Sequence, residues 1–423
     1  MATGAVTGSL EGSVEAKLST LRAEAPQWKA QPFTIFRVPA YVRESNRTAY
    51  KPRVVSIGPY YHGVAALRAM EDHKWRYLHD FLSRNAALSS SALLAEMRSL
   101  EARARACYSE RPALGSDDDF VRMLLLDGCF VLEFFFKWHT KEPDALCDVG
   151  WGVTLVTADL LLLENQIPFF VVETLYDLVA GVHGGRENLL NLILEYISVE
   201  PLIALPSSTR EIHHLLHLYY ECFVPKRSPD RSAPRKAAAR VIPRATEMSA
   251  AGVTFMRRKS ARDTYDVTFD GRRGVMEMPV MEIDDMKRPL LVNLIAFEQS
   301  QGAEEARVVT SYVSLMGMLV RTAQDVELLR RRGILGNLLA DDEEAARFLS
   351  HLGDGSAMNY DRQVFAGIYE DVQRYCGSWW HKHRAALRRD YFGSPWSAIS
   401  FVVAGVVVAL TATQTYFTVF PQR

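Results

Sequence analysis

Residues 116–135 read SDDDFVRMLLLDGCFVLEFF and carry the clearest helical pattern in the chain. Ser116 belongs to the residue types that cap helix N-termini, and the three aspartates after it place negative charge at the positive end of a helix dipole. Side chains suited to a core then recur at spacings of three and four, the period of one helix face: Leu124, Leu125, Gly128, Val131, Leu132 and Phe135. The stretch predicts a helix packed into a hydrophobic core.

The same period extends outward through most of the chain. It covers Met70, Lys74, Tyr77, Leu78 and Phe81, a last helix from Val364 to Trp379, and the ranges 156–163, 168–178, 188–197, 211–223, 290–299, 304–322, 323–331 and 336–352. Val54, Val55 and Ile57 suit a short strand, and an Asp270-Gly271 turn predicts a small hairpin or sheet within residues 253–283. The expected fold class is mainly α: a multi-helix globular body with a small β-hairpin or sheet element, plus one C-terminal transmembrane helix.

Composition is that of a globular protein. Hydrophobic residues make up 48% of the 423 residues and charged residues 23%, which excludes a disordered or collagen-like chain. The 49 Lys and Arg residues balance the 50 Asp and Glu residues, so we do not expect nucleic acid as a partner. The five cysteines form no CxxC pair, which favours reduced thiols in a reducing compartment.

The chain divides by composition into three parts. Residues 1–31 predict a flexible lead-in without the apolar core of a secretory signal peptide. Residues 32–390 predict the mainly helical domain, inside which the Pro-, Ala- and Arg-rich stretch 225–240 predicts a basic flexible linker. Residues 391–423 predict a membrane anchor with a short tail.

The anchor is predicted from the apolar run over residues 399–410. Trp396 and Tyr416 flank this run and lie about 30 Å apart on a helix, the thickness of a hydrocarbon core, so each ring can occupy one membrane interface. The alternative is a buried core helix, because polar side chains follow the run: Thr411, Thr413, Gln414 and Thr415.

Flanking charge predicts the orientation of the span. The positive-inside rule places the body in the cytosol, at the plasma membrane or an endomembrane, because four basic residues precede the run: Lys382, Arg384, Arg388 and Arg389. The lipid bilayer is then an expected partner. Gly405 and Ala409 form a small-xxx-small pair, which permits a homodimer through the anchor, although such a pair also arises by chance in an Ala- and Val-rich run.

One polar cluster interrupts an apolar region. Glu164, Asn165 and Gln166 lie between Leu160–Leu163 and Ile167–Phe170, and we expect them to cap a helix junction or to form a buried hydrogen-bond network. Asn293 and Glu298 invite the same interpretation and could pair with the first segment. The alternative is a catalytic polar site.

No motif predicts a reaction or a cofactor. His213 and His217 lie one helical turn apart, but Glu221 lies eight residues from His213, about 12 Å along the axis, so packed histidines are favoured over a metal site. Acidic residues at 282, 284 and 285 could hold a cation, although the end of a strand is the simpler interpretation. Phosphate loops, dinucleotide fingerprints and nucleophile elbows are absent from the sequence.

Seven blocks, taken together and in order, resemble one family. They cover about residues 33–417: VVSIGPY (54–60), MEDHKW (70–75), MLLLDGCF (123–130), LENQIPF (163–169), IPRATEM (242–248), NLIAFEQ (293–299) and DYF (390–392). The chain resembles the plant-specific family called "domain of unknown function 247". The resemblance implies a plant protein with one C-terminal span and no agreed catalytic residues, and some grass members resemble pollen-side determinants of self-incompatibility.

The expected function is therefore that of a membrane-anchored interaction, recognition or signalling component with a protein partner that the sequence does not identify. Two alternatives stay open. One is an enzyme with an unfamiliar polar site around Glu164, Asn165, Gln166, Asn293 and Glu298, and the other is a passive helical scaffold.

Overall fold

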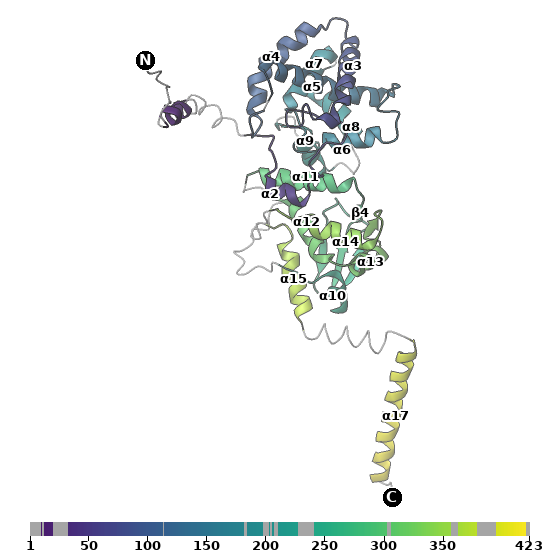
Figure 1. Ribbon diagram of the computed structural model, residues 1–423. Coiled ribbons are helices and arrows are strands. Elements are labelled where there is room, and N and C mark those ends of the chain that lie inside the picture. Colours follow the sequence, from purple (N-terminus) through teal and green to yellow (C-terminus); the bar gives the residue numbers. More distant parts are fainter. Residues whose placement is uncertain are drawn as a thin grey trace. The chain divides into compact units, whose positions relative to one another are not determined.

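The helix predicted from residue 116 onward is confirmed in the computed structural model as α5 (Asp117–Thr140). Ser116 caps it by accepting a hydrogen bond from the Asp119 N–H at 3.2 Å. Four helices pack around α5: α3 (Ala69–Ser83), α4 (Ser90–Ala106), α7 (Phe169–Ala180) and α8 (Arg186–Ile197) (Figure 1). Gly128 allows α7 to approach closely, because a Cβ at this position would lie 2.4 Å from Leu175 Cδ1. These helices form the core predicted from the sequence.

The structure describes residues 10, 12–19, 33–112, 114–181, 184–197, 203, 205–206, 210–226, 241–302, 306–356, 363–378 and 395–419, with side chains of the last helix over 403–415. Of the predicted lead-in over 1–31, the structure describes residues 10 and 12–19, which are helical and exposed, and of the linker over 225–240 it describes residues 225 and 226. The chain divides into two compact units, one within 1–225, 285–305 and 354–357, and the other within 226–284, 306–353 and 358–423.

The first unit is discontinuous in sequence. Besides the five helices of its core it contains η1 (Ala65–Leu67), α2 (Ala40–Ser45), α6 (Gly152–Leu160) and α9 (Leu215–Phe223). The helix α11 (Lys287–Ser300) also belongs to it and packs against α9, although about 60 residues separate the two along the chain. Residues 33–63 are mostly without regular structure.

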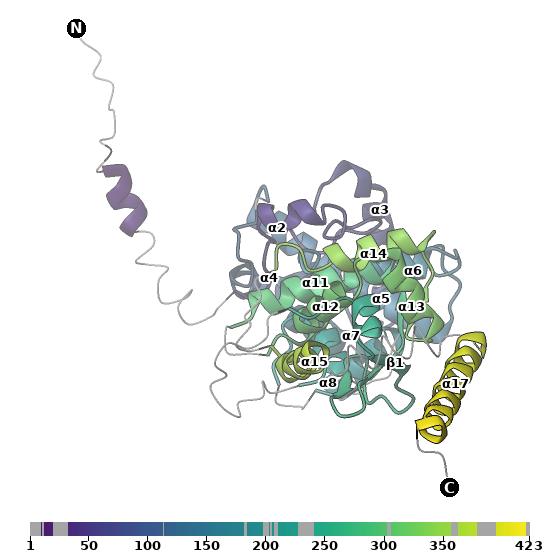
Figure 2. The same ribbon diagram turned by 90° about the horizontal axis from the view of Figure 1, so that it is seen from below.

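The second unit holds two small sheets. In the first sheet, β3 (Val275–Met278) pairs in parallel with β1 (Thr254–Arg257) and antiparallel with β2 (Thr268–Asp270). In the second, β4 (Met281–Ile283) pairs in parallel with β5 (Leu335–Asn337). The helices of this unit include α10 (Ala245–Ala250), α12 (Val308–Leu319), α13 (Ala323–Arg331), α14 (Asp342–His351) and α15 (Ala366–Gly377). Figure 2 shows α14 beside α12 and α13, with which it packs.

Several predicted elements were wrong in detail. The helix expected over 336–352 begins only at Asp342, because residues 335–337 form β5. The helix expected over 211–223 begins at Leu215, because His214 caps it by accepting from the His217 N–H. The strand expected at residues 54–57 does not form, since its N–H groups are bonded to side chains rather than to a neighbouring strand.

The predicted transmembrane helix was also wrong. Within the part of the chain that the structure describes, no helix combines enough length with enough apolar character to cross a bilayer. The C-terminal helix α17 (Pro395–Val419) loses its apolar run after Leu410, because four of the next five residues are Thr or Gln. The expectations of a single-pass, tail-anchored protein and of a membrane localisation fail with it.

The residues assigned to the anchor are placed as follows. Gly405 and Ala409 lie on α17, whose described side chains are all exposed. The side chains of Trp396 and Tyr416 and the whole basic cluster lie outside the described residues: Lys382, Arg384, Arg388 and Arg389.

Candidate functional site

The cluster singled out in the sequence lies in the loop between α6 and α7. Glu164, Asn165 and Gln166 are only 1%, 0% and 2% exposed, so this loop runs through the interior of the first unit. A buried loop carries backbone N–H and C=O groups that need partners. The side chains of the loop and its surroundings supply them, and we call this set the hub: Lys74, Asp127, Asp159, Glu164, Asn165, Gln166 and Asn293.

Asp159 and Asn165 hold the extended segment around Val55. The Asp159 carboxylate accepts hydrogen bonds from the N–H groups of Arg53, Val54 and Val55 at 2.8, 2.7 and 2.9 Å. Asn165 accepts from the Ile57 N–H at 2.7 Å and donates to the Val55 carbonyl at 3.0 Å. Two side chains therefore take the place of a neighbouring β-strand.

Lys74 and Asp127 continue this row as a buried ion pair. The two side chains are 0% and 1% exposed, and Lys74 Nζ lies 2.6 Å from Asp127 Oδ1. Lys74 also donates to the Ser56 carbonyl at 2.6 Å, while Asp127 accepts from the Gly58 N–H at 2.7 Å. Gly58 has φ +79°, and a Cβ there would lie 2.2 Å from the Gln166 carbonyl oxygen, so only glycine fits.

Glu164 binds residues that precede the extended segment around Val55. Its carboxylate accepts from the Val38 N–H at 2.6 Å, from the Tyr61 hydroxyl at 2.7 Å and from the Arg43 guanidinium, which reaches both carboxylate oxygens. Arg43 also donates to the Val38 carbonyl at 3.1 Å. Burial, together with the charge of Glu164, raises the pKa of the Tyr61 hydroxyl, which therefore stays protonated and donates.

Gln166 and Asn293 connect the loop to two further helices. Gln166 donates to the carbonyls of Leu160 and Leu162 and accepts from the Leu215 N–H at 3.0 Å, at the start of α9. Asn293, on α11, accepts from the Leu163 N–H and donates to the Ala49 carbonyl, both at 2.8 Å. The structure thus brings Asn293 together with the loop, across 130 residues of sequence.

Glu298 lies apart from the hub. It is 2% exposed and accepts a hydrogen bond from the Tyr220 hydroxyl at 2.9 Å. Of the five side chains proposed from the sequence as a polar cluster, four therefore belong to the hub and Glu298 lies apart from it.

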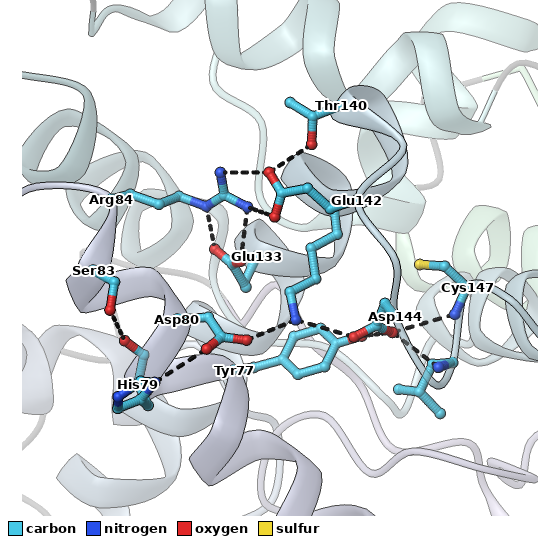
Figure 3. A network of polar contacts seen from close by, with 12 residues as sticks. Tyr77, His79, Asp80, Ser83, Arg84, Glu133, Thr140, Glu142, Asp144 and Cys147 are labelled. Carbon is cyan, nitrogen blue, oxygen red and sulfur yellow. Dashed lines mark hydrogen bonds and ion pairs between the residues drawn. The ribbon is translucent and has the colours of Figure 1, made fainter.

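A second polar network fixes the loop after α5 (Figure 3). Lys137 Nζ lies 2.7 Å from Asp80 and 3.0 Å from Asp144, and the Tyr77 hydroxyl donates to Asp144 at 2.6 Å. Beside it, two nitrogens of the Arg84 guanidinium donate to the Glu133 carboxylate at 2.6 and 2.8 Å, and Arg84 also contacts Glu142. This network ties α3, α5 and residues 141–148 together.

Two opposing effects set the pKa values of the hub. Burial disfavours the charged form of each group, whereas hydrogen bonds and opposite charges favour it. Burial raises the pKa of Asp159 to about 6, although its three backbone N–H donors act to lower it. Burial also raises the pKa of Asp127, against the effect of Lys74. Burial alone would lower the pKa of Lys74, but the carboxylates of Asp127 and Glu71 outweigh it and raise that pKa, so the ammonium stays charged.

The four hub side chains that the sequence singled out are committed to the protein's own groups. Glu164, Asn165, Gln166 and Asn293 are buried, and each donates to or accepts from at least two protein groups. The enzyme alternative required these side chains to line a cavity as available acids or bases. Their arrangement instead provides hydrogen bonds that the backbone of a buried loop would otherwise lack.

The histidine and acidic motifs are placed differently from a metal site. The rings of His213 and His217 contact each other, with centroids 4.8 Å apart and planes tilted by 32°, and the His217 Nδ1 accepts from the His213 N–H. Among the described residues, no group of three or more His, Cys, Asp or Glu side chains is arranged to hold a metal. Glu282 is exposed on β4, and the acids at 284 and 285 follow the end of that strand.

Sequence reasoning missed three members of the hub as site residues. Asp127 and Asp159 are single acids inside apolar blocks, and Lys74 occupies a position on the apolar face of α3. A lone charge where the helical period requires a core residue signals a buried, paired group. Apart from Glu71, one turn before Lys74, the partners of these charges are more than 50 residues away in sequence or in irregular backbone, so the pattern alone could not identify them.

The fold and the hub define a class: a mainly helical protein in which a buried polar loop fastens an irregular N-terminal segment. The chain belongs to the DUF247 family, described as plant proteins of unknown function, whose family model matches residues 35–410. The family resemblance is thereby confirmed. The comparisons give no support to the C-terminal anchor that the resemblance implied.

Two relatives from Arabidopsis thaliana show the extent of the match. The chain is 30% identical over 411 residues to UPF0481 protein At3g47200, covering 90% of this chain and 85% of that protein. It is 22% identical over 483 residues to the putative UPF0481 protein At3g02645, covering 92% and 90%. No solved structure matches the chain.

Proposed function

We propose that this chain is a protein-interaction component with a recognition role, and that its first unit presents a rigid surface to a protein partner. The observation that carries the proposal is the hub, in which the polar side chains that could have served a reaction are buried and bonded to the protein's own backbone. Pre-organisation of this kind lowers the entropy cost of binding. A family of plant proteins without a described activity is compatible with this role.

Large aromatic side chains on the surface of the first unit support the proposal. Tyr41 is 77% exposed on α2, Trp75 is 52% exposed on α3, and Trp151 is 56% exposed just before α6. Trp and Tyr are enriched among the residues that dominate binding energy at protein interfaces, whereas burial is their usual state in a free protein. We assign these three positions as candidate anchors for the partner.

The test compares partner capture by matched surface variants. Proximity labelling in plant cells with the full-length protein identifies candidate partners, and their affinity is then measured for wild type and for Tyr41→Ala, Trp75→Ala and Trp151→Ala. We expect at least one aromatic variant to weaken binding more than tenfold, since hot-spot truncations cost about 2 kcal/mol or more. Leu94→Ala, which truncates a 40% exposed side chain on α4, is the control. Unchanged affinity in all three aromatic variants would contradict the proposal.

A further inference from the structure

The second unit contains a pocket of about 580 Å³, which no part of the proposed function uses. Its walls come from three segments: residues 241–247, the residue at 321 before α13, and the C-terminal end of α15. Ile242 and Cys376, at 3% and 7% exposure, form part of its apolar wall. A volume of this size lies within the range of about 300–1,000 Å³ that is typical of small-molecule sites.

A buried carboxylate holds two of these walls in place. Asp325, at 0% exposure, accepts from the N–H and hydroxyl of Thr246 at 2.9 and 2.8 Å, and from the Arg321 N–H at 3.3 Å. It therefore fixes the backbone at Arg321 and at Thr246, which follows Arg244 by two residues. The third wall is tied by Gln373, which donates to the Val241 carbonyl at 2.7 Å. The pocket is thus pre-organised.

The charges that line the pocket are unequal. Arg244 and Arg321 contribute two guanidinium groups, against one carboxylate from Glu247. Glu247 lies 3.2 Å from Arg244 Nε, and its side chain is 57% exposed. Arg321 is exposed, and no hydrogen bond or ion pair joins its guanidinium to another described residue. A pocket with an uncommitted guanidinium favours an anionic ligand, because the planar N–H fork matches carboxylate and phosphate oxygens.

We infer that this pocket binds an organic anion in which a carboxylate or phosphate group is attached to an apolar body. Arg321 pairs with the anionic group, Arg244 adds to the positive potential, and the wall formed by Ile242 and Cys376 contacts the apolar body. This inference concerns the second unit and goes beyond the proposed function, which rests on the first.

The experiment measures binding of three probes to the full-length protein by calorimetry and by the shift in thermal midpoint. Phenyl phosphate and benzoate carry the two candidate anionic groups on the same ring, and phenol is the neutral comparison. We expect at least one anion to bind and to raise the midpoint, because a ligand of the folded state stabilises it, and we expect no effect from phenol. The anion that binds identifies the head group.

Three variants inside the pocket and one control outside it then locate the binding site. Arg321→Gln and Arg244→Gln remove one guanidinium each, and we expect each to weaken anion binding about tenfold or more. Arg321→Lys keeps the charge but loses the fork, so its affinity is expected to lie between wild type and Arg321→Gln. Arg272→Gln removes an exposed arginine outside the pocket and should bind like wild type. Equal binding of phenol, no binding of either anion, or wild-type affinity in Arg321→Gln would overturn the inference.

Discussion

The hub of the first unit and the pocket of the second use the same residue types in opposite ways. In the hub, amides, carboxylates and an ammonium group are buried and bonded to backbone groups or to one another. In the pocket, the Arg321 guanidinium is exposed and has no bonded partner among the described residues. The comparison shows that a polar residue indicates a binding site only when its hydrogen-bonding capacity is not already used by the fold.

The largest expected effect follows from breaking the buried ion pair. Lys74→Met leaves the Asp127 carboxylate buried without its cation, so we expect a loss of about 3–5 kcal/mol in the free energy of unfolding. Urea unfolding of the purified protein measures this loss. The double variant Lys74→Met/Asp127→Leu is the control and should recover part of it, because no charge remains buried. A single variant as stable as wild type would contradict a structural role for the pair.

The next effect is a pH dependence of the unfolding free energy, and it depends on Asp159. Because its folded pKa of about 6 lies above the ordinary value of 3.8, the folded state holds this proton more tightly than the unfolded state does. The stability that this group contributes is present below pH 3.8 and is lost as pH rises through 6, by about 3 kcal/mol. Unfolding free energies of wild type and Asp159→Asn, compared across this range, should diverge with that slope. Parallel curves would contradict the raised pKa.

A smaller loss is expected where one amide connects two segments. Asn293→Ala leaves the Leu163 N–H and the Ala49 carbonyl without their partner inside the protein, at a cost of about 2 kcal/mol. Denaturant unfolding measures the loss. Gln299→Ala, on the same helix but only partly buried, is the comparison and should cost less. Equal costs would show that the position of Asn293 in the hub has no special importance.

The smallest change in stability is expected for the arginine of the pocket. Arg321→Gln is expected to change the free energy of unfolding by less than about 0.5 kcal/mol, because an exposed side chain whose guanidinium has no bonded partner among the described residues contributes little to folding. The same denaturant measurement as for the hub variants tests this. A loss as large as that of Asn293→Ala would mean that the pocket arginine serves the fold, and the contrast between the two regions would disappear.

Local patterns predicted much of the helical structure. The α5 helix with its Ser116 cap, the bounds of α13 and the position of Lys74 on the core face of α3 all followed from residue spacing and capping preferences. These features depend on neighbours within one or two helical turns. The sequence contains that information directly.

Elements whose limits are set by distant contacts were not predictable in the same way. The helix expected over 156–163 ends at Leu160. The Gln166 side chain donates to the carbonyls of Leu160 and Leu162, which backbone N–H groups would have bonded if the helix had continued. The strand β5 forms because β4 pairs with it from more than 50 residues away. The polar character of the loop at 164–166 was visible in the sequence, but its partners at Val38, Ile57 and Leu215 became known only from the fold.

Native-state hydrogen exchange of the backbone amides at residues 53–58 measures whether side chains of the hub hold this irregular segment in place. The N–H groups of Arg53, Val54, Val55, Ile57 and Gly58 all donate to hub side chains. We predict exchange slowed to the level of the α5 core, with opening free energies close to that of global unfolding. Exchange as fast as in an exposed loop would contradict the account.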